Sequence, residues 1–294
     1  MKIKKAVIPA AGLGTRLLPA TLAQPKEMLP CGKKPTIQYV VEELKAAGVE
    51  DILFITGYAK RALEDHFDLG SLIRFENSGK SEIIKEMQTT FSNLKFFFTR
   101  QEKPIGLADA IGLAKEFVAD EPFFVALGDT IIHSDEPGDY LKRLAQIHSE
   151  KSSVGTILLE EVAKIEVKKY GIIEGNKISP RVWQITNLIE KPTPEKAPSQ
   201  VAVCGRYLFT SEIFKAIKKT EPGVGNEMQL TDSIRILLGE GREIWGLEID
   251  ETKERRYDIG NALTFAIAFI ELCLKDREIA TDLKPYLKEL VKKI

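Results

Sequence analysis

The segment from residue 10 to residue 30, AAGLGTRLLPATLAQPKEMLP, holds residue types that together can bind phosphate. Gly12 and Gly14 have no side chains, so backbone N–H groups near them can turn toward an anion and approach it closely. Arg16 and Lys26 add two positive charges to the same segment. The combination predicts a site for a small, strongly anionic ligand.

Two commoner phosphate-binding motifs are excluded by residue identity. A dinucleotide fingerprint, GxGxxG, requires glycine where Leu17 stands, and a Walker A loop requires Gly-Lys-Ser/Thr where the chain has Gly14-Thr15-Arg16. A pair of glycines alone usually marks a tight turn from a strand into a helix. Because Arg16 and Lys26 follow the pair here, phosphate binding is the better interpretation, and a nicotinamide-dependent oxidoreductase is a remote alternative.

Two aspartates are candidates for holding a metal ion. Asp129 ends the apolar run FFVALGD, at the carboxyl end of a predicted strand, where open α/β sheets bind ligands. The alternative role, capping of the next turn, is less favoured after so apolar a strand. Asp258, in ERRYDIGN, is the second candidate. Because Mg²⁺ keeps several waters and takes one or two carboxylates plus phosphate oxygens, two aspartates suffice for a Mg²⁺ site.

A sheet must position these residues. In the first half of the chain, short apolar runs such as DILFITG and FFVALGD alternate with amphipathic segments such as 37–47 and 107–117. Apolar residues in these segments recur at helical spacing, and the runs between them are apolar on both faces, which is typical of strands covered by helices on each side. The pattern predicts an α/β fold with a doubly wound, mostly parallel, Rossmann-like central sheet.

The second half of the chain has a different pattern. Strand-rich pieces such as YGIIEGNKI and VAVCGRYLF are interrupted by Gly, Asn and Pro, which predicts a mixed-sheet extension. Residues 262–294 are predicted to be helical, either packed on the core of their own chain or in contact with another copy, and a homo-oligomer, dimer or tetramer, is expected. No linker or low-complexity tract divides the chain, so we expect one domain, 1–294, with segments 1–150, 151–261 and 262–294.

The composition excludes several classes of protein. Lys and Arg total 42 against 43 Asp and Glu, and the net charge of −1 gives no long-range field for nucleic acid or a membrane surface. The three cysteines stand alone, which predicts neither a disulfide framework nor structural zinc. No run approaches the roughly 18 apolar residues of a spanning helix, and the apolar run near the N-terminus is too short for a signal peptide. We expect a cytoplasmic protein that binds neither nucleic acid nor membranes.

The glycine-rich segment resembles the signature loop of bacterial UTP–glucose-1-phosphate uridylyltransferases, within the sugar nucleotidyltransferase family. The matching residues are GLGTRLLPAT and PKEMLP, and the similarity continues through GKKPTIQYVVEELKAAG, LGDTII, LIEKP, VAVCGRYLF, GVGNEMQLTDSI and YDIGN. The resemblance implies an enzyme that transfers a uridylyl group from UTP to glucose 1-phosphate, giving UDP-glucose and pyrophosphate, with Mg²⁺ as cofactor. The expected step is in-line attack of the sugar phosphate on the α-phosphorus.

By this resemblance, residues 1–150 form the nucleotide-binding half. Arg16 and Lys26 are its catalytic cations, which neutralise charge on the triphosphate and the departing pyrophosphate. Gln101 reads the pyrimidine edge, since an amide can both donate and accept hydrogen bonds; its residue type alone fits a polar surface position equally well. The other implied nucleotide-binding residues are Ala10, Ala11, Gly12, Gly14, Thr15, Gly106 and Asp129.

The resemblance makes residues 151–261 the sugar-phosphate-binding half. Glu190 accepts hydrogen bonds from sugar hydroxyls, Lys191 is the third catalytic cation and grips the sugar phosphate, and the backbone of Gly171 lies against the sugar. Without the resemblance, the residue types of Glu190 and Lys191 indicate a solvated strand end. Because neighbouring strand residues point to opposite faces, the two need not form an ion pair. The pairing of Asp129 with Asp258 around the metal also comes from the resemblance.

Two departures from the family pattern leave the base open. Residues 127–129 read LGD where related uridylyltransferases often have LPD, and residues 106–109 read GLAD where they commonly have GLGH; both forms are nearer the thymidylyl type. The same chemistry with dTTP, or with another nucleotide and sugar 1-phosphate, is therefore one alternative. A non-catalytic nucleotide-sensing module is another. For the stretch NEMQLTDSI a helix without a catalytic role is predicted.

Overall fold

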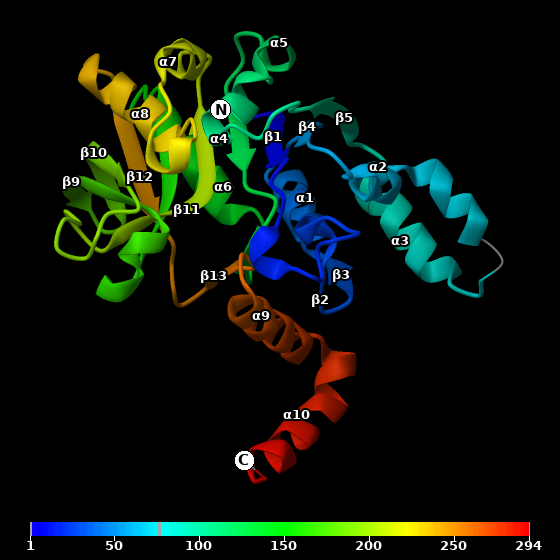
Figure 1. Cartoon of the computed structure of the whole chain (residues 1–294). Coiled ribbons are helices and arrows are strands. Elements are labelled where there is room, and N and C mark those ends of the chain that lie inside the picture. The colour runs from blue at the N-terminus through cyan, green and yellow to red at the C-terminus, as the bar shows by residue number, and fades with distance from the viewer. Residues whose placement is uncertain (1, 76–77, 294) are drawn as a thin grey trace.

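Nine strands of the described residues form one sheet that runs through the molecule (Figure 1). The computed structural model describes residues 2–75 and 78–293. In the order in which they pair, the strands are β5 (Lys95–Arg100), β4 (Asp51–Thr56), β1 (Lys5–Ala10), β6 (Phe123–Ala126), β11 (Val201–Phe209), β8 (Gly155–Glu161), β12 (Ile244–Glu248), β10 (Val182–Glu190) and β9 (Gly171–Ser179). Two short pairs stand apart from this sheet: β2 (Pro30–Cys31) with β3 (Lys34–Pro35), and β7 (Thr130–Ser134) with β13 (Glu254–Asp258).

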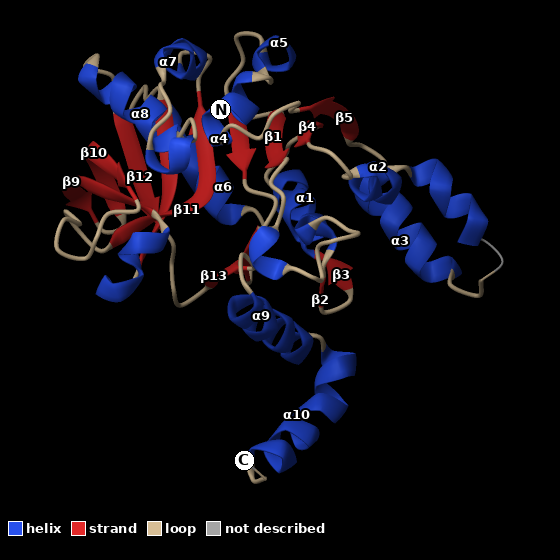
Figure 2. Cartoon of the chain, in the orientation of Figure 1, coloured by secondary structure: helices blue, strands red, loops and turns tan. Residues whose placement is uncertain are grey.

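The sheet separates two hydrophobic cores, and helices cover both (Figure 2). Along β1, Ala6 and Ile8 belong to one core and Val7 to the other, as the alternation of a strand requires. The first core is covered by α1 (Thr36–Ala46), α2 (Arg61–Phe67), α3 (Ser81–Phe91) and α6 (Asp139–Glu150). The second is covered by α4 (Leu107–Gly112), α5 (Lys115–Val118), α7 (Ile213–Lys219) and α8 (Leu230–Gly239). The predicted α/β class is therefore confirmed.

The expectation of a mostly parallel sheet is met by one half only. Strands β5, β4, β1 and β6 are parallel, as the alternation of runs and helices in the first half predicts. Beyond β6 the pairing is mixed: β11 runs antiparallel to β6 and β8, and β10 runs antiparallel to β9 and β12. For β9 and β10 the reason is the short turn that joins them, since parallel neighbours need a long crossover. A further pairing of β9 with β11 closes these later strands into a barrel-like ring.

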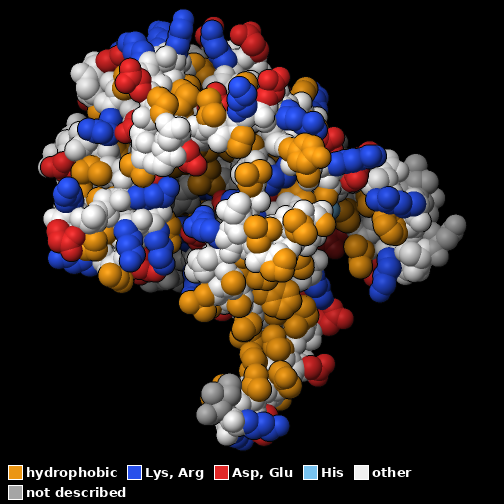
Figure 3. All heavy atoms as spheres, viewed as in Figure 1, with side chains coloured by type: hydrophobic (Ala, Val, Ile, Leu, Met, Phe, Trp, Pro, Cys, Tyr) orange, Lys and Arg blue, Asp and Glu red, His pale blue; other side chains and the backbone are white. Residues whose placement is uncertain are grey.

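The two last helices extend away from the sheet (Figure 1). Helix α9 (Ala262–Lys275) packs through Ala268 and Leu272 on the residues around β2 and β13, and α10 (Arg277–Val291) continues outward from it. Hydrophobic side chains gather along both helices on the face shown in Figure 3, and Tyr286 and Val291 of α10 are 62% and 71% exposed. The alternative that this segment packs entirely on its own core is wrong for α10. No helix in the described part of the chain has the length and apolarity needed to cross a bilayer.

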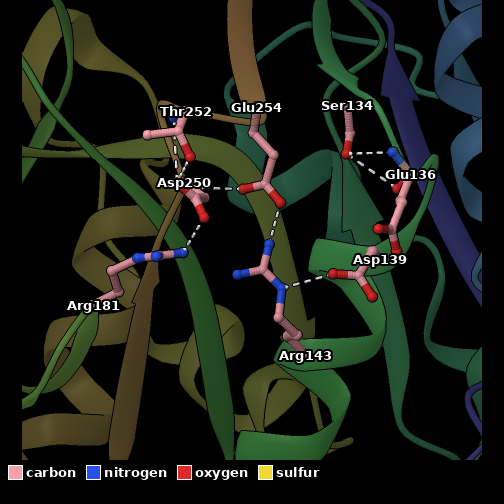
Figure 4. Close-up of polar contacts among 8 residues, drawn as sticks. All are labelled: Ser134, Glu136, Asp139, Arg143, Arg181, Asp250, Thr252 and Glu254. Carbon is pink, nitrogen blue, oxygen red and sulfur yellow. Dashed lines mark hydrogen bonds and ion pairs between the residues drawn. The ribbon is translucent and has the colours of Figure 1, made fainter.

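The turn that leads into β13 is fastened by ion pairs (Figure 4). Arg143 of α6 pairs with both Asp139, at 3.0 Å, and the buried Glu254. Glu254 in turn accepts from the backbone N–H of Asp250 at 2.8 Å, and Asp250 pairs with Arg181 at 2.7 Å. These contacts fix the start of β13, the strand whose last residue is Asp258.

Candidate active site

A cavity of about 890 Å³ opens where strands of both halves of the sheet end. Every residue that the sequence marks as a site residue lines it, except Ala10. Ala10, the last residue of β1, is buried in the hydrophobic core. The predicted lining residues are Ala11, Gly12, Gly14, Thr15, Arg16, Lys26, Gln101, Gly106, Asp129, Gly171, Glu190, Lys191 and Asp258. Residues far apart in the sequence are thus brought to one cavity.

The glycine-rich segment forms a tight loop after β1. Gly14 has φ 68°, in the left-handed region that glycine enters freely, and its carbonyl accepts from the N–H of Leu17 at 3.0 Å and the hydroxyl of Thr21 at 2.8 Å. A Cβ built on Gly12 would lie 3.6 Å from the Nζ of Lys26. The absence of a side chain at Gly12 therefore leaves the ammonium of Lys26 open toward the loop.

Lys26 and Asp129 form a largely buried ion pair in the cavity wall. Burial disfavours the ammonium of Lys26, but Asp129 and Glu27 outweigh it and raise the pKa of Lys26. Burial likewise disfavours the carboxylate of Asp129, but Lys26 outweighs it, with a further contribution from Arg16, and the pKa of Asp129 is lowered. Both groups are therefore charged at neutral pH.

Asp258 lies beside Asp129 because β13 pairs with β7. In that pairing Asp258 stands opposite Thr130, the residue after Asp129, and the N–H of Ile259 donates to the carbonyl of Asp129 at 3.2 Å. The carboxylate of Asp258 accepts from the N–H of Gly260 at 2.8 Å. The two carboxylates therefore face one cavity from neighbouring ends of β7 and β13. Their positions in the sequence alone did not indicate this proximity.

A buried arginine braces the turn that carries Asp129. Arg206 of β11 pairs with Glu43 of α1, which also accepts from the hydroxyl of Tyr140. The guanidinium donates to the carbonyl of Leu127 at 3.3 Å and to that of Thr130 at 2.6 Å. These carbonyls lie on either side of Asp129, so Arg206 fixes the turn from beneath the cavity.

Glu190 is the last residue of β10, and the backbone of the next residue, Lys191, has an unusual conformation. Lys191 has φ 46°, which is costly for a non-glycine residue, and its N–H donates to the carbonyl of Tyr170 at 3.0 Å. The left-handed backbone turns the chain, so the Nζ of Lys191 lies 3.1 Å from Glu190 Oε1. The two side chains thus form an ion pair, which the alternation of an extended strand did not require. The second oxygen of Glu190 accepts from the hydroxyl of Thr231 at 3.0 Å.

Gln101 and Gly106 form the wall next to the start of α4. The side-chain N–H groups of Gln101 donate to the carbonyl of Gly106 at 3.1 Å and to Asp109 Oδ2 at 2.7 Å. Gly106 has φ 135°, and a Cβ on it would collide with the backbone of Met228. Met228 itself pairs with this loop: its N–H donates to the carbonyl of Ile105 at 2.7 Å. Only glycine fits at position 106.

Sequence reasoning missed two parts of this site. The first is the stretch NEMQLTD: Met228 is bound to the loop beside Gln101 while Thr231 holds Glu190, so the stretch connects the two halves of the cavity. Nothing in its residue types indicates this. The second is Arg256, which lines the cavity, pairs with Glu160 and lies with its guanidinium 4.4 Å from the ring centre of Tyr170. The signal was present, since Arg256 stands two residues before Asp258.

Comparison with known proteins gives a consistent result. Residues 5–272 match the family model for nucleotidyl transferases. A UTP–glucose-1-phosphate uridylyltransferase of Staphylococcus epidermidis is 43% identical over 98% of this chain and 99% of its own length. One of Bacillus subtilis is 42% identical over 99% of this chain and 98% of its own length.

Solved structures agree with the sequence matches. A UDP-glucose pyrophosphorylase complexed with UDP-glucose has a TM-score of 0.82 and 36% identity, covering 98% of this chain and 99% of its own. A UTP-bound enzyme of the same name from Acinetobacter baumannii has a TM-score of 0.88 at 29% identity, with the same coverage. A Bacillus anthracis structure described as a glucose-1-phosphate thymidylyltransferase scores lower, at 0.70 and 28% identity, covering 92% of this chain and 95% of its own. The chain therefore belongs to the nucleotidyl transferase family, and within it to the UTP–glucose-1-phosphate uridylyltransferases that it matches over nearly their full length.

Proposed function

We propose that this protein transfers a uridylyl group from UTP to glucose 1-phosphate, giving UDP-glucose and pyrophosphate. The observation that carries the proposal is that one cavity gathers Arg16, Lys26 and Lys191 beside Asp129 and Asp258. Two polyanionic substrates need such an arrangement, because their mutual repulsion is the main barrier to bringing them together. The names and titles of the full-length relatives support uridine as the base and glucose 1-phosphate as the acceptor.

In the proposed division of labour, residues 1–150 bind the nucleotide. The loop from Ala11 to Thr15 offers backbone N–H groups to the base and phosphates, with Gln101 and Gly106 at the base. Arg16 and Lys26 offset charge on the triphosphate and on the departing pyrophosphate. A residue whose pKa is raised, as that of Lys26 is, keeps its proton throughout and acts as a fixed charge.

Residues 151–261 take the sugar phosphate, and the whole chain works as one domain. Glu190, held by Thr231, accepts from sugar hydroxyls. Gly171 lines the cavity beside them, where a Cβ would stand 2.8 Å from the Cγ2 of Thr231, and its backbone lies against the sugar. Lys191 grips the phosphate. The strained backbone of Lys191 supports this role, because such strain persists where the surroundings demand one side-chain direction.

The chemical step that we propose is in-line attack. An oxygen of the sugar phosphate attacks the α-phosphorus of UTP, a new P–O bond forms, and the bond to the pyrophosphate oxygen breaks. The attacking phosphate is already ionised, so no general base is required, and no Ser or Cys nucleophile takes part. Catalysis consists of holding the reacting atoms in line and neutralising the charge that moves to pyrophosphate.

We infer that Mg²⁺ is the cofactor and that Asp129 and Asp258 hold it. Both carboxylates line one cavity, and the pairing of β13 with β7 brings the chain at Asp258 beside the chain at Asp129. In residues 2–75 and 78–293 no group of three or more His, Cys, Asp or Glu side chains is arranged to hold a metal ion. Two aspartates leave the remaining positions to water and phosphate oxygens, which suits Mg²⁺. When bound, the ion would offset phosphate charge.

We also propose that the protein forms a homo-oligomer, dimer or tetramer, in the cytoplasm. The apolar side chains exposed along α9 and α10 support self-association (Figure 3). The three cysteines are buried and unpaired, as is usual in a reducing compartment. Sedimentation of the wild type beside a Tyr286→Asp variant tests the assembly: the variant should shift toward the monomer.

Pyrophosphate release tests the reaction, the base and the metal together. Five nucleoside triphosphates are each supplied with glucose 1-phosphate, with and without Mg²⁺. UTP should give the fastest release, and chelation should abolish it. A clear preference for dTTP would favour the thymidylyltransferase alternative. Nucleotide binding without release for any pair would favour a sensing module.

A further inference from the structure

The side-chain amide of Gln101 has only one orientation open to it. Gln101 is 6% exposed and lines the cavity, and its NH₂ group donates to both the carbonyl of Gly106 and the carboxylate of Asp109. Both partners are acceptors only. A rotated amide would place Oε1 against a carbonyl and a carboxylate, neither of which can donate, so the NH₂ group must face Gly106 and Asp109.

The side-chain oxygen of Gln101, Oε1, is left free to bind a ligand. With both N–H bonds used, Oε1 is the polar atom left for a ligand, and it has no hydrogen-bond donor among the residues that the structure describes. Oε1 is also not a fully buried atom without a partner, in contrast to Trp183 Nε1. The cavity wall at Gln101 therefore presents an acceptor.

We propose that Asp109 is a specificity-determining residue, which fixes Gln101 so that the site selects a pyrimidine carrying a ring N–H over one carrying a bare ring nitrogen. This rests on the proposed function, which puts the base at Gln101. Uracil and thymine carry an N–H at the ring position between their two carbonyls. Cytosine has an unprotonated nitrogen there, so it would face Oε1 as a second acceptor, and it is nearly the same size as uracil. Asp109 acts through Gln101 and touches no substrate.

A purely local role is the competing explanation for Asp109. It stands in the first turn of α4, where an acidic side chain favours the helix. That role would change stability without changing the choice of base. Because α4 has only six residues and Asp109 is half-exposed, replacement by Ala should leave the fold intact.

The test compares UTP with CTP in the wild type and in two variants of Asp109. For the wild type, Asp109→Ala and Asp109→Asn, kcat/KM with glucose 1-phosphate is measured for each nucleotide, and the affinity for each nucleotide is measured by calorimetry without the sugar. Asp120→Ala, at an exposed position outside the cavity, is the control for loss of one negative charge.

In Asp109→Ala the preference for UTP over CTP should fall roughly tenfold, both in kcat/KM and in affinity. The reason is that only the Gly106 carbonyl then opposes rotation of the Gln101 amide. Asp109→Asn should keep most of the ratio, because its Oδ1 still accepts. An unchanged ratio in Asp109→Ala, with UTP still used, would overturn the inference. A wild type that does not use UTP would instead overturn the proposed function.

Discussion

Replacement of Arg206 by Met tests the buried support of the Asp129 turn. The Arg206 side chain is 0% exposed and its partner Glu43 is 4% exposed. Met has a comparable volume and no charge, so the variant leaves a buried carboxyl group whose one remaining side-chain partner among the described residues is the Tyr140 hydroxyl. Removal of one partner of a buried pair destabilises by about 3–5 kcal/mol, and for a chain of this size we expect a fall in Tm of roughly 6–15 °C.

The stability lost in Arg206→Met should depend on pH in a defined direction. Burial raises the pKa of Glu43, and Arg206 opposes that rise, so the variant should push the pKa of Glu43 higher still. A carboxyl whose folded pKa lies above its unfolded value contributes stability at low pH and loses it as pH rises through the folded pKa. The deficit of Arg206→Met should therefore be small near pH 4 and grow toward neutrality.

Denaturant unfolding of four proteins measures the contribution of the Arg206–Glu43 pair to stability, apart from its effect on the active site. Arg206→Met, Glu43→Gln and the double variant are compared with wild type, and the double variant should be more stable than Arg206→Met because no charge is left unpaired. Below its Tm, Arg206→Met should also turn over at least about tenfold more slowly, since the Asp129 turn loses its support. The reasoning is refuted if Arg206→Met unfolds within about 1 kcal/mol of wild type at pH 7, or if the two single effects simply add.

Three further changes probe other contacts. Lys26→Met should lower kcat by about 10²–10³ through loss of a charge at the developing pyrophosphate; wild-type turnover would contradict the role given to Lys26. Thr231→Val removes the donor to Glu190 and should raise KM for glucose 1-phosphate several-fold, by about 1 kcal/mol, while KM for UTP stays the same; an equal change in both would count against it. Burial lowers the pKa of His148 to about 4, so stability should fall as pH drops from about 6.5 to 4, by as much as roughly 3 kcal/mol, and His148→Gln should flatten that window in pH-dependent unfolding.

The parallel half of the fold could be predicted because its strands are apolar on both faces and alternate with amphipathic helices. The later half could not be predicted in the same detail. A short turn at Pro180 makes β9 and β10 antiparallel neighbours, and the contact of β9 with β11 joins residues that no local pattern relates. Arg206 stands out as a cation within the apolar run VAVCGRYLF. Its partner Glu43 lies on another element, and nothing in the sequence around Glu43 indicates the pairing.

The candidate site divides in the same way. Gly12, Arg16 and Lys26 are close in sequence, so their residue types could be read as one loop. The approach of Asp258 to Asp129 depends on the pairing of β13 with β7, which is a tertiary contact. The left-handed backbone of Lys191 is invisible in a sequence in which the following proline favours an extended residue.

The most direct measurement follows the oxygens of glucose 1-phosphate. With the phosphate oxygens labelled by a heavy isotope and UTP unlabelled, mass spectrometry of both products shows which bond has formed. Attack of the sugar phosphate on the α-phosphorus predicts that UDP-glucose carries all of the label and pyrophosphate none. Label in pyrophosphate, or no labelled UDP-glucose, would contradict the assignment of this cavity to uridylyl transfer.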